Sequence, residues 1–341
     1  MLQAVMVKPG QIEFKQVEQP KPGAKDVLVK IKNIGVCGSD IHVYHGLHPY
    51  TSYPVVQGHE VAGVVAEVGA QVTAFAPGDN VTFMPQVTCG VCYPCRHGLY
   101  HICDALKVMG FQTGGAAQEY FLVPEHLTIK LPAQMSYEAG ALIEPVAVAV
   151  HALGRAGMDL AGKKIVVFGA GPIGNLVAQV AKGLGAAAVM IVELSDFRLA
   201  KAKACGIEFT VNPQKEDVPE ALVKNFGPDR ADLMMECVGV EATMTQAVNL
   251  ARKGTTIVVV GVFGKKPVVD LGLVQDRELS LVGTLMYQKK DYEKAIELAN
   301  AGKLCLDPLV TDRFPFQAYL EAYHHIEQAK DQVMKVMINV G

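Results

Sequence analysis

The chain has 341 residues, of which half are hydrophobic and 19% are charged, and its formal net charge is −3. This balance excludes a disordered chain, and the lack of a basic block argues against binding to nucleic acid or an anionic membrane surface. No window has the ~18 uninterrupted apolar residues of a spanning helix, and the N-terminus lacks the apolar core of a signal peptide. We therefore expect a cytoplasmic protein whose eight cysteines are thiols or metal ligands.

The first part of the chain is rich in short β-like runs separated by Gly/Pro turns. Residues 27–32 alternate apolar and polar side chains, which is typical of a half-buried strand. Further strands are predicted at 61–68 and 81–84, the second of them after a Pro-Gly-Asp-Asn turn at 77–80. Many short strands of this kind predict an antiparallel, barrel-like domain.

Two glycine-flanked segments of this domain carry metal-binding side chains. Cys37 and His59 offer a thiolate and an imidazole, which are both natural zinc ligands. A carboxylate, either Glu60 or the distant Glu144, would supply the third contact. Taken alone, Cys37 would be interpreted as a small buried apolar residue, but the combination predicts a catalytic metal site.

A second metal site is predicted downstream, where four cysteines lie close together: Cys89, Cys92, Cys95 and Cys103. Four thiolates on one short loop are typical of a structural zinc, in which the protein fills every coordination position. Ferredoxin-type clusters usually have another fourth spacing and a proline after the last cysteine, where this chain has Asp104. We predict a structural zinc lobe over about residues 86–105.

From residue 148 to about 285, strands and helices alternate. Strands are predicted at 165–168, 188–193, 231–237 and 256–261, and helices at 145–156, 175–184, 195–204 and 241–252. Such alternation indicates an α/β domain with a doubly wound parallel sheet. Beyond it, helices are predicted at 292–301 and 318–329, and a final strand at 333–340.

A Gly-Ala-Gly-Pro-Ile-Gly motif at 169–174 follows the first of these strands and opens a helix. Its glycines permit a tight turn, close approach of the backbone to a pyrophosphate and close packing of helix on strand. Glu193, at the end of the next strand, would bind ribose hydroxyls and repel a 2′-phosphate, so we expect NAD rather than NADP. Arg198 argues weakly against that preference. The predicted cofactor-binding residues are Gly169, Gly171, Pro172, Ile173, Gly174, Glu193, Arg198, Val238 and Gly261.

With these motifs the chain resembles a zinc-dependent medium-chain alcohol dehydrogenase along essentially its whole length. The family's zinc signature has its counterpart in Gly58-His59-Glu60, followed by Gly63, Gly69 and Val72. The resemblance implies a GroES-like β-barrel catalytic domain followed by a Rossmann-fold NAD-binding domain. The expected boundaries are 1–147 for the catalytic domain, 148–285 for the NAD-binding domain and 286–341 for a segment that returns to the catalytic domain.

Glu144 makes the chain similar to the sorbitol/polyol dehydrogenase branch, because liver- and yeast-type alcohol dehydrogenases carry a cysteine ligand in this segment. The resemblance implies that Glu60 and Glu144 both belong to the catalytic zinc site, with Cys37 and His59. Which of the two carboxylates binds zinc directly stays open.

The resemblance also assigns roles to three neighbours of Cys37. Ser39 matches the hydroxyl residue that contacts the substrate alcohol, and His42 matches the outer end of a proton relay. Asp40 matches the carboxylate that orients the zinc-binding histidine. A further hypothesis is that the substrate pocket is lined by the residues of the following loop: Tyr44, His45, His48 and Tyr50.

The activity implied by the resemblance is NAD-dependent oxidation of a secondary alcohol of a polyol or sugar derivative, with two zinc ions per subunit. Galactonate-like sugar-acid, inositol-type and threonine 3-dehydrogenases are alternatives within the family. A zinc-free reductase of the same fold and a non-enzymatic NAD-binding protein are alternatives outside this activity. Relatives imply a homodimer or homotetramer.

Overall fold

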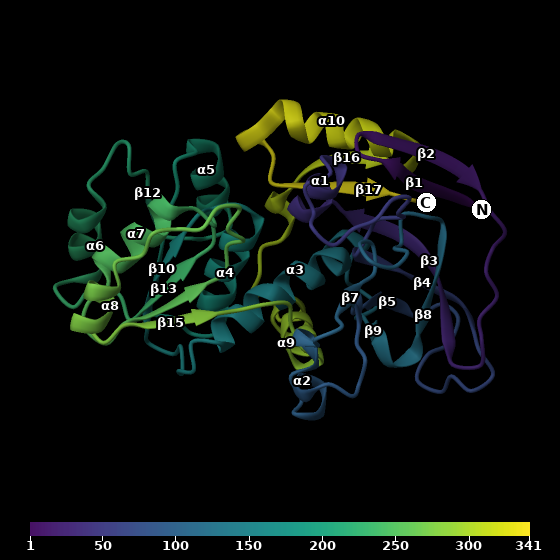
Figure 1. The fold of residues 1–341 in the computed structure, drawn as a ribbon, viewed down its shortest axis with the longest axis horizontal. Coiled ribbons are helices and arrows are strands. Elements are labelled where there is room, and N and C mark those ends of the chain that lie inside the picture. Colours follow the sequence, from purple (N-terminus) through teal and green to yellow (C-terminus); the bar gives the residue numbers. More distant parts are fainter. The chain divides into compact units, whose positions relative to one another are not determined.

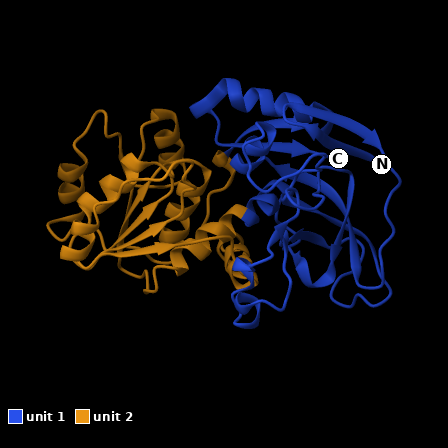
Figure 2. Cartoon of the chain, in the orientation of Figure 1, with its two compact units in different colours: residues 1–144, 310–341 blue, residues 145–309 orange.

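The computed structural model describes residues 1–341 and divides them into two compact units. Unit 1 comprises residues 1–144 and 310–341, and unit 2 comprises residues 145–309 (Figure 2). The end of the chain therefore returns to the unit in which the chain begins. No helix combines the length and the apolar character needed to cross a membrane.

Unit 1 is built on a seven-stranded sheet in the order β16-β17-β3-β4-β5-β9, with β8 also paired to β3. All pairs are antiparallel except β16 with β17, which agrees with the antiparallel prediction. The elements of unit 1 are β1 (Leu2–Lys8), β2 (Gln11–Gln16), β3 (Asp26–Gly35), α1 (Gly38–Tyr44), β4 (Glu60–Val68), β5 (Asn80–Phe83), β6 (Gln86–Val87), α2 (Tyr93–Arg96), β7 (Lys107–Val108), β8 (Tyr120–Pro124), β9 (Thr128–Lys130), β16 (Val310–Pro315), α10 (Tyr319–Ala329) and β17 (Lys335–Asn339).

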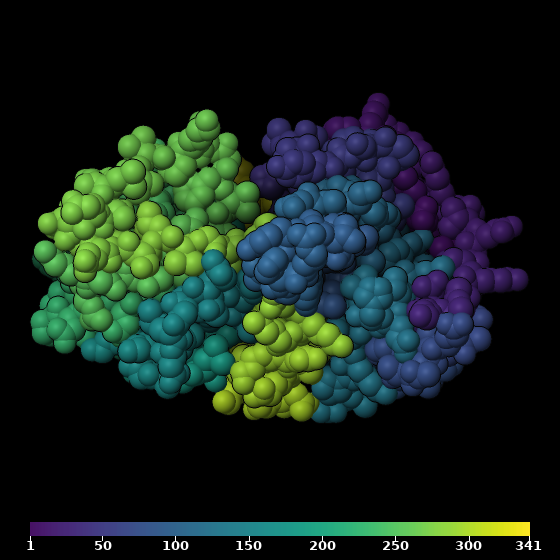
Figure 3. Space-filling view, turned by 60° about the horizontal axis from the view of Figure 1, so that its bottom comes forward, coloured from purple at the N-terminus to yellow at the C-terminus, as the bar shows by residue number.

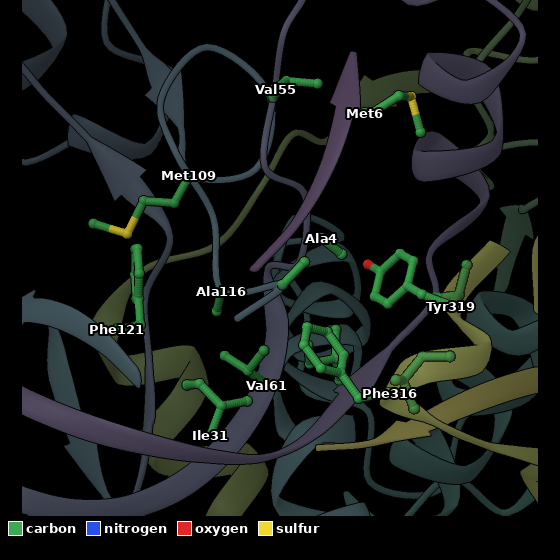
Figure 4. Close-up of a cluster of buried hydrophobic side chains, with 14 of the residues drawn as sticks. Ala4, Met6, Ile31, Val55, Val61, Met109, Ala116, Phe121, Phe316 and Tyr319 are labelled. Carbon is green, nitrogen blue, oxygen red and sulfur yellow. The ribbon is translucent and has the colours of Figure 1, made fainter. Parts of the chain in front are cut away.

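The returning segment is part of the core of unit 1. Phe316 and Tyr319 face the same apolar cluster as Ala4 and Met6 of the first strand (Figure 4). All four side chains are at most 2% exposed, and burying a large aromatic or aliphatic side chain stabilises a fold by roughly 1.5–3 kcal/mol. Unit 1 therefore depends on both ends of the chain.

Unit 2 contains a six-stranded parallel sheet in the order β12-β11-β10-β13-β14-β15 (Figure 1). The strand order reverses between β10 and β13, as it does at the ligand-binding edge of doubly wound folds. The predicted parallel sheet is confirmed. The elements of unit 2 are β10 (Lys164–Phe168), α4 (Pro172–Gly183), β11 (Ala188–Val192), α5 (Asp196–Ala204), β12 (Phe209–Val211), α6 (Val218–Phe226), β13 (Leu233–Glu236), α7 (Glu241–Leu250), β14 (Thr256–Val259), α8 (Leu271–Asp276), β15 (Ser280–Gly283) and α9 (Lys289–Asn300).

The helix that joins the two units, α3 (Tyr137–Gly154), begins earlier than the sequence predicts. The prediction starts this helix at Pro145, and proline is common in the first turn of a helix. In the structure Pro145 lies inside the helix, and the side chain of Ser136 accepts the N–H of Ala139 at 3.2 Å at its start. Burial of the apolar residues before the proline outweighs the lost backbone hydrogen bond.

The sequence also predicts that the chain returns at residue 286, whereas residues 286–309 belong to unit 2 in the structure. Contacts within unit 2 account for this difference. Asp291 at the start of α9 accepts a hydrogen bond from the His151 ring at 2.8 Å, and the Cys305 N–H donates to Gln179 at 2.7 Å. Tyr292 is fully buried, and α9 belongs to unit 2.

Candidate active site

Three side chains with metal-binding atoms meet where β3 ends and β4 begins. The ligand atoms of Cys37, His59 and Glu60 all lie within 4.8 Å of one another. Pairing of Gly35 with Glu60 across the two strands brings the segments together. A Cβ on Gly35 would lie 2.3 Å from a carboxylate oxygen of Glu60, so a larger residue at this position would displace that carboxylate.

Asp40 links the cysteine to the histidine. Cys37 caps the N-terminus of α1, and its N–H donates to the Asp40 carboxylate at 2.9 Å. The other oxygen of Asp40 lies 3.6 Å from Nδ1 of His59. That nitrogen is buried and has no hydrogen-bond partner, and the ring also contacts the Cys37 thiol. The imidazole therefore lies between the Asp40 carboxylate and the Cys37 thiol.

The surroundings of His59 are strongly negative. Burial alone would lower the pKa of His59, but Asp40, Cys37 and Glu144 raise that pKa to about 10. Burial also raises the pKa of the Asp40 carboxyl, against the opposing effect of His59. A site that favours positive charge this strongly is electrostatically suited to a divalent cation.

A residue missed at the sequence level, Lys335 of β17, completes the cluster. Its ammonium group donates to the two carboxylate oxygens of Glu60 at 2.8 and 2.6 Å and to the Val36 carbonyl at 3.1 Å. Burial lowers the pKa of Lys335, but Glu60 and Cys37 raise it above its ordinary value. The sequence feature that could have identified Lys335 is its position as a lone lysine in the apolar strand predicted at 333–340.

The remaining predicted residues of this site lie nearby with different degrees of contact. Glu144 on α3 is buried and its charge acts on His59 and Lys335, but it lies outside the group of three close ligands. Ser39 and His42 are one turn apart on α1, so they share a helix face. His42 is exposed and Ser39 is partly buried.

The donor atoms fit a zinc ion. A cysteine sulfur, a histidine nitrogen and a carboxylate oxygen form a typical catalytic zinc set with one open position. The unpartnered Nδ1 of His59, which faces Asp40, fits the usual arrangement in which a metal-bound imidazole has a carboxylate behind it.

Unit 1 contains a pocket of about 400 Å³. Phe111 is one of its lining residues. The centroid of the Phe111 ring lies 4.8 Å from the ring centroid of His59 and 4.8 Å from that of His48. The polar residues of the lining are Tyr50, Ser52, Gln112 and Thr113, and no charged residue belongs to it. The pocket therefore offers neutral hydrogen-bonding groups.

The four loop residues predicted to surround the substrate lie on different sides of this part of unit 1. Tyr50 lines the pocket, and His48 stacks on Phe111. Tyr44 and His45 do not line it, because α1 turns them toward α10, where Tyr44 bonds His324 at 3.1 Å and His45 pairs with Glu327.

The four cysteines of the predicted lobe also meet. The Sγ atoms of Cys89, Cys92, Cys95 and Cys103 all lie within 4.8 Å of one another. Backbone N–H groups donate to these sulfur atoms, as in the contact of the Cys92 N–H with Cys89 at 3.4 Å. The N–H groups of Val91 and Cys92 lower the pKa of Cys89 to about 6, which favours the metal-binding thiolate. In the space-filling view the blue part of the chain that includes this lobe reaches the surface (Figure 3).

The glycine motif of unit 2 lies between β10 and α4. A Cβ on Gly174 would lie 2.0 Å from the Gly169 carbonyl, so close packing requires glycine there. Gly171 has open space, with Arg198 as the nearest group at 4.0 Å from the position of a Cβ. The loop thus leaves room for a phosphate group to approach the N-terminus of α4.

Glu193 follows β11, and its carboxylate accepts the N–H groups of Ala170 and Ser195 at 2.8 and 3.0 Å. It therefore connects the glycine loop to the end of the neighbouring strand. The predicted residues Val238 and Gly261 follow β13 and β14, which lie next to each other in the sheet.

Sequence reasoning missed Glu236, which organises this end of β13. The buried carboxylate accepts the N–H groups of Val238 and Gly239 at 3.0 and 2.9 Å and the Thr243 hydroxyl at 2.7 Å. It thereby fixes the turn that carries Val238.

Comparison with known proteins agrees with this arrangement. The alcohol dehydrogenase GroES-like domain matches residues 23–133, and the zinc-binding dehydrogenase domain matches residues 172–301. The chain belongs to the zinc-binding alcohol dehydrogenase family. The GroES-like and Rossmann folds implied by the sequence resemblance are confirmed by these matches and by the order of the strands in unit 2.

Individual relatives match nearly the whole chain. A 2-dehydro-3-deoxy-L-galactonate 5-dehydrogenase from Pseudoalteromonas atlantica is 36% identical over 93% of this chain and 92% of its own. Sorbitol dehydrogenase 1 from Saccharomyces cerevisiae is 35% identical over 98% and 96%. The crystal structure of a zinc-binding dehydrogenase from Sinorhizobium meliloti bound to NADP is 31% identical, with a TM-score of 0.92 and 99% of each chain covered. The chain is thus an oxidoreductase of the alcohol and polyol dehydrogenase type.

Proposed function

We propose that the protein is a zinc-dependent dehydrogenase that oxidises a secondary hydroxyl group of a neutral polyol to a ketone, with NAD as hydride acceptor. The observation that carries this proposal is the meeting of Cys37, His59 and Glu60 within 4.8 Å. The His59 ring packs on Phe111, which lines a pocket that has no charged lining residue. We infer the reaction class from the family and the substrate class from the residues that line the pocket.

In this proposal Cys37, His59 and Glu60 hold the catalytic zinc, with Glu144 as the nearby second carboxylate. When bound there, zinc acts as a Lewis acid that makes a substrate hydroxyl more acidic. Ser39 would accept the proton of that hydroxyl and release its own hydroxyl proton toward His42, on the same face of α1, and His42 would pass a proton to solvent. The four-cysteine lobe holds the structural zinc.

The neutral lining of the pocket favours a polyol over a sugar acid or threonine. The negative charge of a bound carboxylate is best offset by a cationic partner, and the lining contains neither lysine nor arginine. The hydroxyl and amide groups of Tyr50, Ser52 and Gln112 suit a chain of hydroxyl groups. Sugar acids are the second candidate, because the relative from Pseudoalteromonas atlantica is named for one.

In unit 2 the glycine motif would hold the pyrophosphate of the cofactor at the N-terminus of α4. Glu193 would accept hydrogen bonds from the adenosine ribose and would disfavour a 2′-phosphate. These features support NAD as the cofactor.

A screen of NADH formation tests the proposal. Purified zinc-loaded protein is assayed with C5 and C6 polyols, the matched sugar acids of the same stereochemistry, and threonine, with Cys37→Ser as the inactive control. We expect the highest kcat/KM with a polyol and none with Cys37→Ser. Turnover of a sugar acid well above that of its matched polyol would contradict the neutral substrate class, and equal activity of Cys37→Ser would contradict the metal site.

A further inference from the structure

We propose that Gln57 and Tyr323 are positioning residues for the metal-binding imidazole of His59, and that they act through Asp40. This inference rests on the proposed function, because it assumes that His59 binds zinc. Gln57 directly precedes the Gly58-His59-Glu60 segment, whereas Tyr323 lies on α10 in the segment that returns to unit 1.

The three residues form a continuous chain of hydrogen bonds. The hydroxyl of Tyr323 donates to Oε1 of Gln57 at 2.9 Å. The amide nitrogen of Gln57 donates to Oδ1 and to the backbone carbonyl of Asp40 at 3.1 and 3.3 Å. Tyr323, Gln57 and Asp40 are 0%, 2% and 1% exposed, so water does not replace these contacts.

The chemistry of the acceptors fixes the direction of the chain. A backbone carbonyl can only accept, so the amide nitrogen of Gln57 must face Asp40. The amide oxygen is then left for a donor, and Tyr323 provides one. A glutamine held in this way can take only one orientation, and it holds the Asp40 carboxylate in one orientation as well.

The orientation of Asp40 matters because it faces the catalytic cluster. Its Oδ2 accepts the N–H of Cys37 at 2.9 Å, and its Oδ1 lies 3.6 Å from Nδ1 of His59. Nδ1 is buried and has no other partner. The groups behind a metal-bound histidine usually change metal affinity by about 10–100-fold when they are removed.

These hydrogen bonds are the second link between the C-terminal segment and the predicted zinc site. Lys335 on β17 already reaches Glu60, and Tyr323 on α10 reaches Asp40 through Gln57. Tyr323 itself is held by a stacked contact with Tyr319 at 5.5 Å between ring centroids. Two predicted ligands, His59 and Glu60, are thus each supported from the returning segment.

The test compares Tyr323→Phe and Gln57→Leu with Thr82→Val. Tyr323→Phe removes one buried hydroxyl. Gln57→Leu replaces the amide with an apolar side chain of similar size. Thr82→Val is the matched control, because it also removes one buried hydroxyl from unit 1. The Thr82 hydroxyl donates to the Val61 carbonyl at 2.7 Å and takes no part in the hydrogen bonds between Tyr323, Gln57 and Asp40. Each full-length variant is loaded with zinc and challenged with a chelator, and the release of the catalytic zinc is followed. The visible absorption of the Co²⁺-substituted site is recorded in parallel.

We expect Tyr323→Phe and Gln57→Leu to weaken zinc binding at the catalytic site by about 10-fold or more and to alter the Co²⁺ spectrum. The structural zinc and the KM for NAD should not change. The double variant should be no worse than Gln57→Leu, because both residues act along one chain. Thr82→Val should retain zinc like the wild type even if it unfolds at a lower temperature.

Wild-type zinc retention and an unchanged Co²⁺ spectrum in Tyr323→Phe would overturn the positioning role, and this variant decides the matter if Gln57→Leu does not fold. A wild-type chain that binds zinc only at the four cysteines would overturn the proposed function instead. The two failures are therefore distinguishable.

Discussion

At the scale of single residues, the catalytic cluster is defined as much by Lys335 as by the predicted ligands. A buried ammonium group that bonds both oxygens of Glu60 neutralises one of the charges that a zinc ion would also neutralise. Breaking such a buried pair by removing one partner is costly, because the other charge is left uncompensated.

Lys335→Met should therefore destabilise the zinc-free protein by about 3–5 kcal/mol. Zinc should restore more stability to the variant than to the wild type, because Glu60 is then free to face the metal. Denaturant unfolding with and without zinc checks this prediction. An equal stabilisation of both proteins by zinc would argue that Glu60 does not face the metal.

Glu193→Ala should lower the NAD-to-NADP ratio of kcat/KM by roughly 10-fold or more, because hydrogen bonds of a carboxylate contribute about 1.5–3 kcal/mol. Glu193→Gln is the matched control, since it keeps the shape and removes the charge. Steady-state kinetics with both cofactors provide the measurement. An unchanged ratio in Glu193→Ala would rule out contact of this residue with the ribose.

The residues of the site were predictable to the extent that their signal is local in the sequence. Cys37, His59 and Glu60 stand in short glycine-flanked motifs, and the structure brings them together. Lys335 lies 275 residues from Glu60, and Tyr323 lies 266 residues from Gln57. Nothing in a local pattern specifies such pairs, because they depend on how the returning segment packs.

At the scale of elements, the four-cysteine lobe is a self-contained loop. Its helix, α2, has only four residues and no buried side chain. An element this small has too little apolar surface to fold alone, so a bound metal is expected to hold it.

Cys92→Ser should remove one zinc ion per chain and lower the Tm by several degrees, since the lost metal stabilisation exceeds 1 kcal/mol. The kcat per folded molecule should change less than twofold, because no residue of the predicted catalytic site lies in the lobe. Metal analysis, thermal unfolding and active-site titration check these three outcomes. A large loss of kcat with unchanged Tm would assign the lobe a catalytic role.

A pH-sensitive contact joins the N-terminal ends of the neighbouring strands β10 and β13 of unit 2. Asp232 accepts the Lys164 N–H at 2.8 Å and pairs with Arg252 at 2.6 Å. Burial alone would raise the pKa of Asp232, but these two partners lower it overall.

A depressed folded-state pKa means that the carboxylate stabilises the fold above its unfolded pKa and that this stability is lost as pH falls through the folded value. Asp232→Asn should therefore cost about 1–3 kcal/mol at neutral pH, and the difference from the wild type should shrink below pH ~4. Unfolding free energies measured across this range test the prediction, and a constant difference would refute it.

At the scale of the whole molecule, the order of strands and helices was readable because each element has a distinct hydrophobic period. The parallel sheet around Gly169 and the antiparallel sheet around β3 both follow from this. The boundaries were less accessible. Pro145 suggested a helix start but lies inside α3, and residues 286–309 stay in unit 2 because Asp291 and Cys305 bond to helices of that unit.

The most direct test of the central claim is an anomalous diffraction map of the zinc-loaded crystal at the zinc absorption edge. The account predicts two peaks per chain. One should lie about 2.0–2.3 Å from the sulfur of Cys37 and the ring nitrogen of His59, with a carboxylate oxygen of Glu60 or Glu144 in contact, and the other should lie among the four cysteines. A peak at the four cysteines alone would contradict the catalytic zinc site.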